Sequence, residues 1–469
     1  MMPDTQAPRS LLWLVAAGFF MQTLDATIVN TALPVMATNL GESPLQMQSV
    51  VIAYALTMAM AIPASGWFAD KVGTRRAYFA AVLLFGAGSA LCALSPTLPL
   101  LVASRAVQGL GGAMLLPVGR LAVMRSCSPD EFLPVMSVIA VPGLVGPLIG
   151  PTLGGWLAEY ASWHWIFWIN VPIALAGCLA TLRSMPDTRG VQLGRFDLGG
   201  YLMIATGMVA VSLALDGLTE LGLAHATVLV LLVFGLAALA GYWLHAAQSA
   251  QPLFPPRLFG IPTFGIGLIG NLFARLGGGA MPFLIPLFLQ VGLGYSPARA
   301  GVTMIPVAAA AIAVKQGVTP LIRRLGYRRV LISNTLCIGL LMASFALLKG
   351  SEWWGIRVLQ LAVFGACNSL QFTAMNTVTL KDLPAEFASG GNSLLSMVQM
   401  LSMSLGVAAA GGLLGGFASA YGTAQGAVPA FHATFICIGL MTAASAWIFA
   451  QLRRDVVPTP PRRESLDLG

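Results

Sequence analysis

The sequence predicts an all-α polytopic membrane protein with fourteen transmembrane helices, arranged as two six-helix halves with two extra helices between them. Three observations support this fold class. Hydrophobic residues make up 57% of the 469 residues and charged residues only 9%, whereas a soluble chain carries about 25% charged residues. The apolar residues form runs long enough to cross a bilayer, which takes about 20 residues. Short motifs also recur between the first and last parts of the chain.

The apolar runs can be counted between polar or Gly/Pro-rich breaks. They lie at 11–33, 45–67, 77–95, 98–120, 132–157, 164–184, 198–218, 225–245, 263–291, 297–320, 329–349, 357–379, 390–416 and 428–451. An even number of spans places both termini on one side. The loops and tails on that side hold nineteen lysines and arginines, against Arg299, Lys349 and Arg357 on the other. The positive-inside rule therefore predicts cytoplasmic termini.

An internal repeat divides the chain into related halves, because four short segments recur in the same order at offsets of 253, 253, 252 and 255 residues. The pairs are Glu42-Ser43-Pro44 with Tyr295-Ser296-Pro297, Gly73-Thr74-Arg75-Arg76 with Gly326-Tyr327-Arg328-Arg329, Arg105-Ala106-Val107-Gln108 with Arg357-Val358-Leu359-Gln360, and Pro129-Asp130-Glu131-Phe132 with Pro384-Ala385-Glu386-Phe387. We predict an N-terminal half at 1–185, two extra spans and a connector at 186–261, a C-terminal half at 262–451 and a cytoplasmic tail at 452–469. Parallel halves of this kind enclose a midplane site in many secondary transporters.

Several classes of protein are disfavoured by the remaining composition. The net charge of +8 is carried by short loops between apolar runs, which is the pattern of topology determinants and not of a nucleic-acid surface. No pair of the six cysteines falls in a predicted outer loop, so no disulfide framework is expected. The four histidines lie at predicted span ends without metal-ligand spacing, and no metal site is predicted. The first apolar run lacks a clean cleavage site and is interpreted as an uncleaved helix.

Four ionisable residues lie inside predicted spans and are candidates for function, because a charge at the bilayer centre costs at least about 2.5 kcal/mol. They are Asp25, Arg105, Arg275 and Lys315. Arg105 and Gln108 share one helix face. Outward snorkelling is the alternative for Arg105, and snorkelling to the cytoplasmic surface is the alternative for Lys315. We predict proton coupling by Asp25 and Arg105, and a substrate cavity that includes Gln22, Asn30, Gln108, Arg275 and Lys315.

Two segments carry further spacing patterns. GWFADKVGTRR at 66–76 is a tight basic loop in which Gly73 permits the turn and Asp70 can accept hydrogen bonds from the next helix. Its simpler interpretation is a set of topology charges. VPGLVGPLIGPTLGGWLAEY at 141–160 places small residues along one helix face next to a proline. Generic close helix packing is the alternative interpretation there.

Together with LDATIVNTALP at 24–34 and the RAVQG element at 105–109, these segments resemble four motifs of the major facilitator superfamily, and specifically of its fourteen-helix drug:proton antiporters. The resemblance covers nearly the whole chain and implies the major facilitator fold. It implies a role in proton transfer for Arg105. It implies a conformational latch at Gly66, Asp70, Lys71, Gly73, Arg75 and Arg76. It also implies an antiporter motif at Gly146, Gly150, Pro151, Gly154 and Gly155, which is typical of exporters.

The function expected from this resemblance is proton-coupled export of small drug-like molecules by alternating access, not enzymatic catalysis. Burial favours the protonated form of Asp25, whereas a neighbouring Arg105 or Arg275 favours the carboxylate. No cofactor is expected, since the proton gradient would drive transport, and we expect a monomer in a bacterial cytoplasmic membrane. One embedded acid among three embedded cations leaves a second possibility, the export of small organic anions or metal-chelating carboxylates. A membrane sensor without transport activity is a remote alternative, and a channel is disfavoured.

Overall fold

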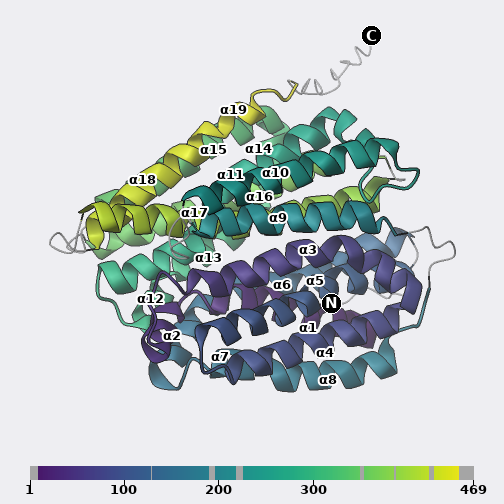
Figure 1. Ribbon diagram of the computed structural model, residues 1–469, viewed down its shortest axis with the longest axis horizontal. Coiled ribbons are helices and arrows are strands. Elements are labelled where there is room, and N and C mark those ends of the chain that lie inside the picture. The colour runs from purple at the N-terminus through teal and green to yellow at the C-terminus, as the bar shows by residue number, and fades with distance from the viewer. Residues whose placement is uncertain are drawn as a thin grey trace, which may run out of the picture.

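The computed structural model describes residues 9–127, 129–189, 196–217, 225–348, 353–384, 387–421 and 427–453, and every regular element in these ranges is a helix. The predicted tail lies outside them from residue 454 onward. The helices run roughly parallel to the long axis of the molecule (Figure 1). The N-terminal half contains α1 (Arg9–Ile28), α2 (Leu33–Leu40), α3 (Gln48–Val72), α4 (Thr74–Ala93), α5 (Leu98–Met124), α6 (Pro129–Tyr160), α7 (Trp165–Trp168) and α8 (Asn170–Ser184).

The remaining helices follow the same order as the predicted spans. The middle pair is α9 (Leu198–Gly217) and α10 (His225–Gln248), followed by the short helix η1 (Pro256–Gly260). The C-terminal half contains α11 (Pro262–Leu287), η2 (Phe288–Gly292), α12 (Pro297–Thr303), α13 (Ile305–Ala313), α14 (Lys315–Leu325), α15 (Tyr327–Ser344), η3 (Phe345–Leu347), α16 (Trp354–Leu380), α17 (Ala388–Tyr421), α18 (Val428–Ala444) and α19 (Ala446–Phe449).

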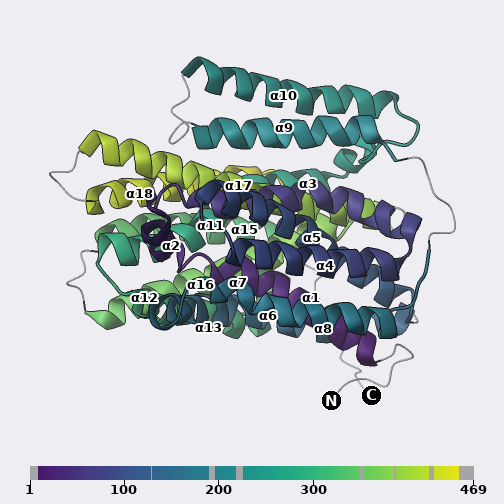
Figure 2. The same ribbon diagram turned by 60° about the horizontal axis from the view of Figure 1, so that its bottom comes forward.

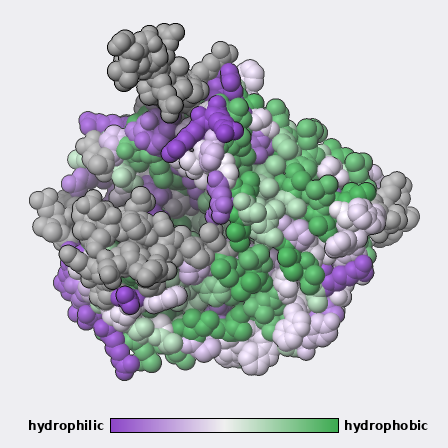
Figure 3. All heavy atoms as spheres, turned by 180° about the vertical axis from the view of Figure 1, so that it is seen from behind, coloured by the Kyte–Doolittle hydropathy of each residue, from purple (hydrophilic) through white to green (hydrophobic). Residues whose placement is uncertain are grey.

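The described helices agree with a multi-pass membrane protein. Twelve are long and apolar enough to cross a membrane, and the bent pair α12–α13 and α14 adds a thirteenth span. The 32-residue helix α6 covers the run predicted at 132–157. On the face shown in Figure 3, hydrophobic side chains cover the middle of the molecule, while hydrophilic ones gather toward the left and at the right margin. Each of the fourteen predicted spans therefore coincides with described helices.

Two predicted spans are less regular than expected. The first was predicted at 11–33, but α1 ends at Ile28 and a turn precedes α2. The hydroxyls of Thr23 and Thr27 donate to backbone carbonyls one turn earlier, which bends helices. The span predicted at 297–320 bends by 52° between α13 and α14. Gly317 and Pro320 follow this bend, and Pro320 has no N–H to donate within the helix.

The extra pair α9 and α10 forms a separate layer beside the two halves (Figure 2). α9 packs against both α3 and α17, one helix from each half. The hydroxyls of Ser212 on α9 and Ser404 on α17 lie 3.2 Å apart in this contact. At the other end of α9, Asp197 caps the helix by accepting the N–H of Gly200 at 2.9 Å. The pair therefore lies along the line where the halves meet.

The halves pack closely at one end of the molecule and diverge toward the other. We call the end with the basic loops, such as 72–76 and 323–329, the inner end; by the positive-inside rule we expect it to face the cytoplasm. At the opposite, outer end, one apolar core joins both halves and includes Ile28 and Phe283. The cores nearer the inner end are largely separate, because Phe85 belongs to a cluster built mainly from the N-terminal half and Leu331 to one built from the C-terminal half.

Candidate functional site

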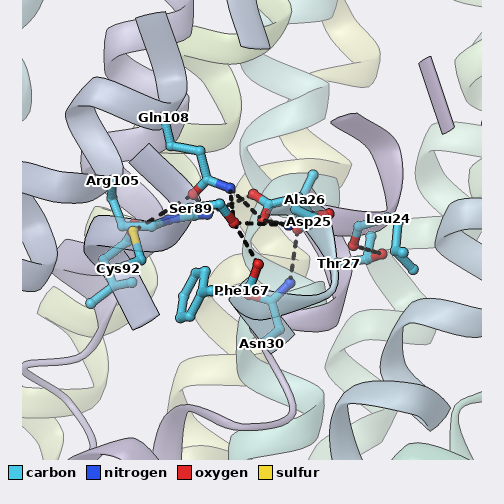
Figure 4. Close-up of polar contacts among 12 residues, drawn as sticks. Leu24, Asp25, Ala26, Thr27, Asn30, Ser89, Cys92, Arg105, Gln108 and Phe167 are labelled. Carbon is cyan, nitrogen blue, oxygen red and sulfur yellow. Dashed lines mark hydrogen bonds and ion pairs between the residues drawn. The ribbon is translucent and has the colours of Figure 1, made fainter. Parts of the chain in front are cut away.

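Asp25 lies at the centre of a buried polar cluster within the N-terminal half (Figure 4). Its Oδ2 atom accepts from Nη1 of Arg105 at 2.6 Å, and its Oδ1 atom accepts from Nε2 of Gln108 at 2.8 Å. Asn170 donates to the same Oδ1 at 3.3 Å and to the hydroxyl of Ser89 at 3.1 Å. Asp25 and Gln108 are fully buried and Arg105 is 1% exposed. We call these five residues the Asp25 cluster.

Four helices supply the Asp25 cluster. Arg105 and Gln108 are three residues apart on α5, so they project from one face, and Nη1 of Arg105 also donates to Oε1 of Gln108 at 2.7 Å. Ser89 comes from α4 and Asn170 from the start of α8. Ser89 and Asn170 were not predicted from the sequence, although Asn170 lies in an aromatic segment between α6 and α8. A polar residue there, next to an apolar run, is the signal that could have indicated it.

The guanidinium of Arg105 is satisfied on several sides. Besides Asp25 and Gln108, its Nε atom donates to the carbonyl of Val50 on α3 at 3.3 Å. The ring of Tyr54 lies 4.2 Å from its Cζ atom, within cation–π range. A buried ion pair is stable only when its remaining donors and acceptors find partners. The Asp25–Arg105 pair meets that condition, and a change in the charge of Asp25 would disturb contacts with α3, α4, α5 and α8.

A cavity of about 320 Å³ lies between the halves on the other side of α1. Thr23, Ala26 and Thr27 of α1 line it, whereas Asp25 does not. Figure 4 shows the same division, since Thr27 lies on the side of α1 away from Arg105 and Gln108. The C-terminal half supplies most of the wall. Its lining residues are Ala274, Arg275, Gly278, Gly279, Pro282, Thr335, Ile338, Asn368, Gln371, Phe372, Met375, Gln399, Met400, Met403 and Thr442.

Arg275 is the ionisable side chain among the described residues that line this cavity. Its Nε and Nη2 atoms are buried and have no hydrogen-bond partner among the described residues. Its Cζ atom lies 4.4 Å from the centre of the Phe372 ring. Buried cations are normally paired, because an unpaired one keeps its full desolvation cost. The arrangement leaves donors available to a ligand with acceptor groups.

The other predicted cavity residues lie elsewhere. Gln108 belongs to the Asp25 cluster, not to the cavity wall. Gln22 and Asn30 are on α1 and the turn after it but are not lining residues, and each has one buried amide oxygen without a partner among the described residues. Lys315 is exposed at the start of α14 and also lies outside the wall. The structure thus places Arg275 in the cavity but does not place these four residues there.

The loop predicted as a latch is held at the inner end by contacts within the N-terminal half. Asp70 accepts from Nη2 of Arg125, at the end of α5, at 2.5 Å. Gly73 has φ 99°, a conformation that favours glycine. Nε of Arg75 donates to the carbonyl of Met185 at 2.6 Å, and Lys71 lies over the ring of Trp67. Arg125 was not identified from the sequence, since it lies outside the motif.

Two further latch residues border these contacts. Gly66 lies near the end of α3 and has open space around its Cα, and Arg76 is exposed in the first turn of α4. The hydroxyl of Thr74, directly before Arg75, donates to the carbonyl of Pro186 at 2.6 Å. The loop therefore ties α3 and α4 to α5 and to the segment after α8.

The glycines of the predicted antiporter motif face two different helices. Side chains at Gly146, Gly150 and Gly154 would overlap Thr23, Thr27 and the carbonyl of Ile28 on α1. A side chain at Gly155 would instead overlap the carbonyl of Pro297 on α12. The carbonyl of Pro151 accepts from the hydroxyl of Thr31 at 3.0 Å. These small residues let α6 approach α1 closely along the face of α1 that lines the cavity.

The paired halves, the cavity between them and the buried ion pair define a membrane transport protein. Comparisons with known proteins agree with this class. The profile of the Major Facilitator Superfamily matches residues 15–407. The chain is 51% identical over 448 residues to a protein of Serratia proteamaculans named "Putative multidrug resistance protein MdtD", covering 95% of this chain and 93% of that one. A protein of the same name from Pectobacterium atrosepticum is 49% identical, with 97% and 98% covered.

A solved structure supports the same fold. The crystal structure of a D-xylose-proton symporter superposes with a TM-score of 0.67 at 16% sequence identity, covering 94% of this chain and 97% of that one. At this identity the likeness concerns the fold alone. The chain belongs to the Major Facilitator Superfamily, and it is a multi-pass membrane transporter of small molecules, not an enzyme.

Proposed function

We propose that this transporter is a proton-coupled antiporter that exports small drug-like molecules by alternating access. The observation that carries the proposal is the fully buried Asp25–Arg105 pair, which shares helix α1 with the cavity but lies on its opposite face. The names of the two bacterial relatives support drug-like substrates. We propose that the gradient of protons is the energy source, without a cofactor, and that one chain suffices.

In this mechanism α1 couples protonation of Asp25 to a change in the cavity that binds the substrate. When Asp25 is ionised, Arg105, Gln108 and Asn170 hold it toward the interior of the N-terminal half. Protonation removes the charge that these donors stabilise and weakens the charge-assisted hydrogen bonds, which are the strong ones in the cluster. α1 then shifts against the glycine face of α6, and Thr23, Ala26 and Thr27 move with it at the cavity wall. Proton loss reverses the shift.

The test is the substitution Asp25→Asn in proteoliposomes with an imposed pH gradient. Asparagine keeps the size of the side chain but cannot exchange a proton, so substrate-induced proton movement should be lost while the folded protein is retained. Asp197→Asn is the matched control, because it neutralises an aspartate outside the spans. Transport by Asp25→Asn with unchanged pH dependence would remove Asp25 from the coupling mechanism.

A second candidate function is the export of small organic anions or metal-chelating carboxylates. The observation that favours it is Arg275, whose Nε and Nη2 atoms have no hydrogen-bond partner among the described residues, in a cavity whose described lining residues include no aspartate or glutamate. A lipophilic cation would meet unfavourable charge in such a cavity, whereas a carboxylate could accept from Nε and Nη2 in the bidentate geometry that arginine offers.

Equilibrium binding to the purified transporter separates the two substrate classes. If anions are the substrates, carboxylates should bind the wild type, and Arg275→Met should weaken that binding by at least about tenfold, since a hydrogen bond to a charged group is worth about 1.5–3 kcal/mol. Arg275→Lys keeps the charge but not the planar fork and should retain part of the affinity. Preferential binding of cationic dyes, unchanged in Arg275→Met, would exclude the anion hypothesis.

A further inference from the structure

The inner ends of the two halves carry related basic loops that differ in charge at one position. Gly73-Thr74-Arg75-Arg76 corresponds to Gly326-Tyr327-Arg328-Arg329 at an offset of 253 residues, and at the same offset Asp70 corresponds to Arg323. Asp70 forms an ion pair with Arg125 in the N-terminal half. The C-terminal half therefore has a cation at the position where the N-terminal half has its paired acid.

The arginines around the C-terminal loop have no such partner. They are Arg323, Arg324 and Arg329, which are exposed, and Arg328, which is half-buried. Among the described residues, no hydrogen bond or ion pair joins any of their guanidiniums to an acceptor. Asp382, which follows the inner end of α16, instead accepts from the hydroxyl of Thr263 at 2.9 Å. Positive charge therefore gathers on this surface without a described side chain to neutralise it.

The helix that leads into this loop is amphipathic. α14 packs on α15 and α16, and its buried residues are Val318 and Ile322. Leu321 and Leu325 are 36% and 43% exposed, and they lie on one side of the helix because they are one turn apart. A helix that exposes both leucines and arginines at a membrane boundary offers apolar contact to acyl chains and cationic contact to headgroups.

We propose that Leu321, Leu325 and these four arginines, which we call the α14 surface, bind an anionic phospholipid of the leaflet at the inner end. Such a lipid carries a phosphate, to which arginine can donate two parallel hydrogen bonds, and acyl chains that can cover the leucines. Free phosphate would satisfy only the arginines. No residue of α14 lines the cavity, so the lipid site is separate from the cavity and does not depend on which substrate is exported.

The experiment measures lipid binding to the full chain, purified in a neutral detergent, by native mass spectrometry. The probes are phosphatidylglycerol and phosphatidylcholine with the same acyl chains. Arg323→Gln combined with Arg324→Gln should weaken binding of phosphatidylglycerol at least about tenfold, the loss expected for two cations at an anionic surface, and should leave phosphatidylcholine unaffected. Arg183→Gln combined with Arg257→Gln is the matched control, because it removes two exposed arginines outside the α14 surface.

Two further variants keep the test decisive. Arg323→Lys combined with Arg324→Lys keeps both charges and should retain part of the affinity. If the glutamine pair does not fold, Leu321→Ser combined with Leu325→Ser should weaken binding of phosphatidylglycerol while all four arginines remain. Equal binding of the two lipids by the wild type, or equal losses in the α14 variant and its control, would overturn the proposal. Displacement of the lipid by an equal concentration of inorganic phosphate would also overturn it, since the ligand would then be free phosphate.

Discussion

Two arginines inside this transporter, the buried Arg105 and the half-buried Arg275, are in opposite electrostatic situations. Arg105 is enclosed by a carboxylate, an amide, a backbone carbonyl and an aromatic ring, whereas Arg275 faces the cavity with two nitrogens that have no partner among the described residues. A buried charge whose hydrogen-bonding atoms all have partners is part of a fixed structure or of a switch. A charge whose hydrogen-bonding atoms lack partners can bind a ligand. This contrast supports assigning the proton to Asp25 and Arg105 and the substrate to Arg275.

Replacing Arg105 tests whether the pair acts as a unit. Arg105→Met leaves the carboxylate of Asp25 buried without its cation, which should cost about 3–5 kcal/mol of folding stability and abolish proton coupling. The double variant Asp25→Asn, Arg105→Met should recover much of the lost thermal stability but none of the coupling, because no buried charge remains. Thermal unfolding of the four proteins in detergent gives the interaction free energy, and additive losses would show that the two residues act independently.

The sequence could predict part of this site for a physical reason. A charge inside an apolar run is visible without a structure, so Asp25, Arg105 and Arg275 were all identified. Which side of a helix faces a partner is less visible, because every face of a membrane helix is apolar. Gln108 was therefore predicted in the cavity, although the three-residue spacing that joins it to Arg105 turns it to Asp25. Ser89 and Asn170 are small neutral residues and give a weak signal in such runs.

At the scale of the element, α1 and α6 form the most distinctive pair. α1 carries the proton site on one face and the cavity wall on the other, and it ends at Ile28, near the level where the glycines of α6 reach it. The sequence predicted the glycine pattern, but it also predicted that the first span would continue to residue 33. The turn at 29–32 contains no glycine or proline, so the sequence carries no helix-breaking residue that would show where the helix stops.

A methyl group at Gly150 should disturb this pair. In Gly150→Ala the added carbon would overlap the hydroxyl of Thr27, and overpacking of this kind costs about 1–3 kcal/mol. We expect lower thermal stability and slower transport, measured in detergent and in proteoliposomes. Thr27→Ala in the same chain removes the hydroxyl and should restore part of both. A Gly150→Ala protein that behaves like the wild type would mean that α1 and α6 are not held this closely.

The start of α9 gives a pH prediction outside the spans. Burial raises the pKa of Asp197, but hydrogen bonds from the N–H of Gly200, from His245 and from the N–H of Leu253 outweigh it and leave the pKa below its ordinary value. A carboxyl with a lowered pKa in the folded state stabilises the fold above its unfolded pKa and loses this effect as the pH falls through the folded pKa. Stability should therefore decline in acid as Asp197 takes a proton.

Two variants separate the cap from the charge. Asp197→Ala removes the helix cap and should cost about 1 kcal/mol at neutral pH. Asp197→Asn is still a good cap and should reduce the acid-dependent part of the loss, because it does not titrate. Thermal unfolding between neutral and acid pH measures both effects. An unchanged acid dependence in Asp197→Asn would assign that dependence to other groups.

At the scale of the whole molecule, the sequence predicted the membrane class and the succession of spans because bilayer thickness imposes them on every helix. The packing of the two halves against each other depends on contacts between residues far apart in the sequence, such as those between α6 and α12. The pattern of residues within a single span does not predict such contacts. The divergence of the halves toward the inner end is therefore a result of the structure. This divergence predicts that the cavity is accessible from the inner end.

Met403 lines the cavity and can report this access. In Met403→Cys, a membrane-impermeant maleimide should label the new thiol in inside-out vesicles and much less in right-side-out vesicles, since one apolar core joins the two halves at the outer end. Asn39→Cys, exposed at the end of α2, should show the reverse preference and confirms vesicle orientation. Labelling of the wild type gives the background from the native cysteines. Adding Gly301→Ala should raise labelling of Met403→Cys from outside, because the new methyl group would overlap the carbonyl of Pro151 on α6 and weaken the contact between α6 and α12. Equal labelling from both sides without Gly301→Ala would contradict a transporter that rests closed at its outer end.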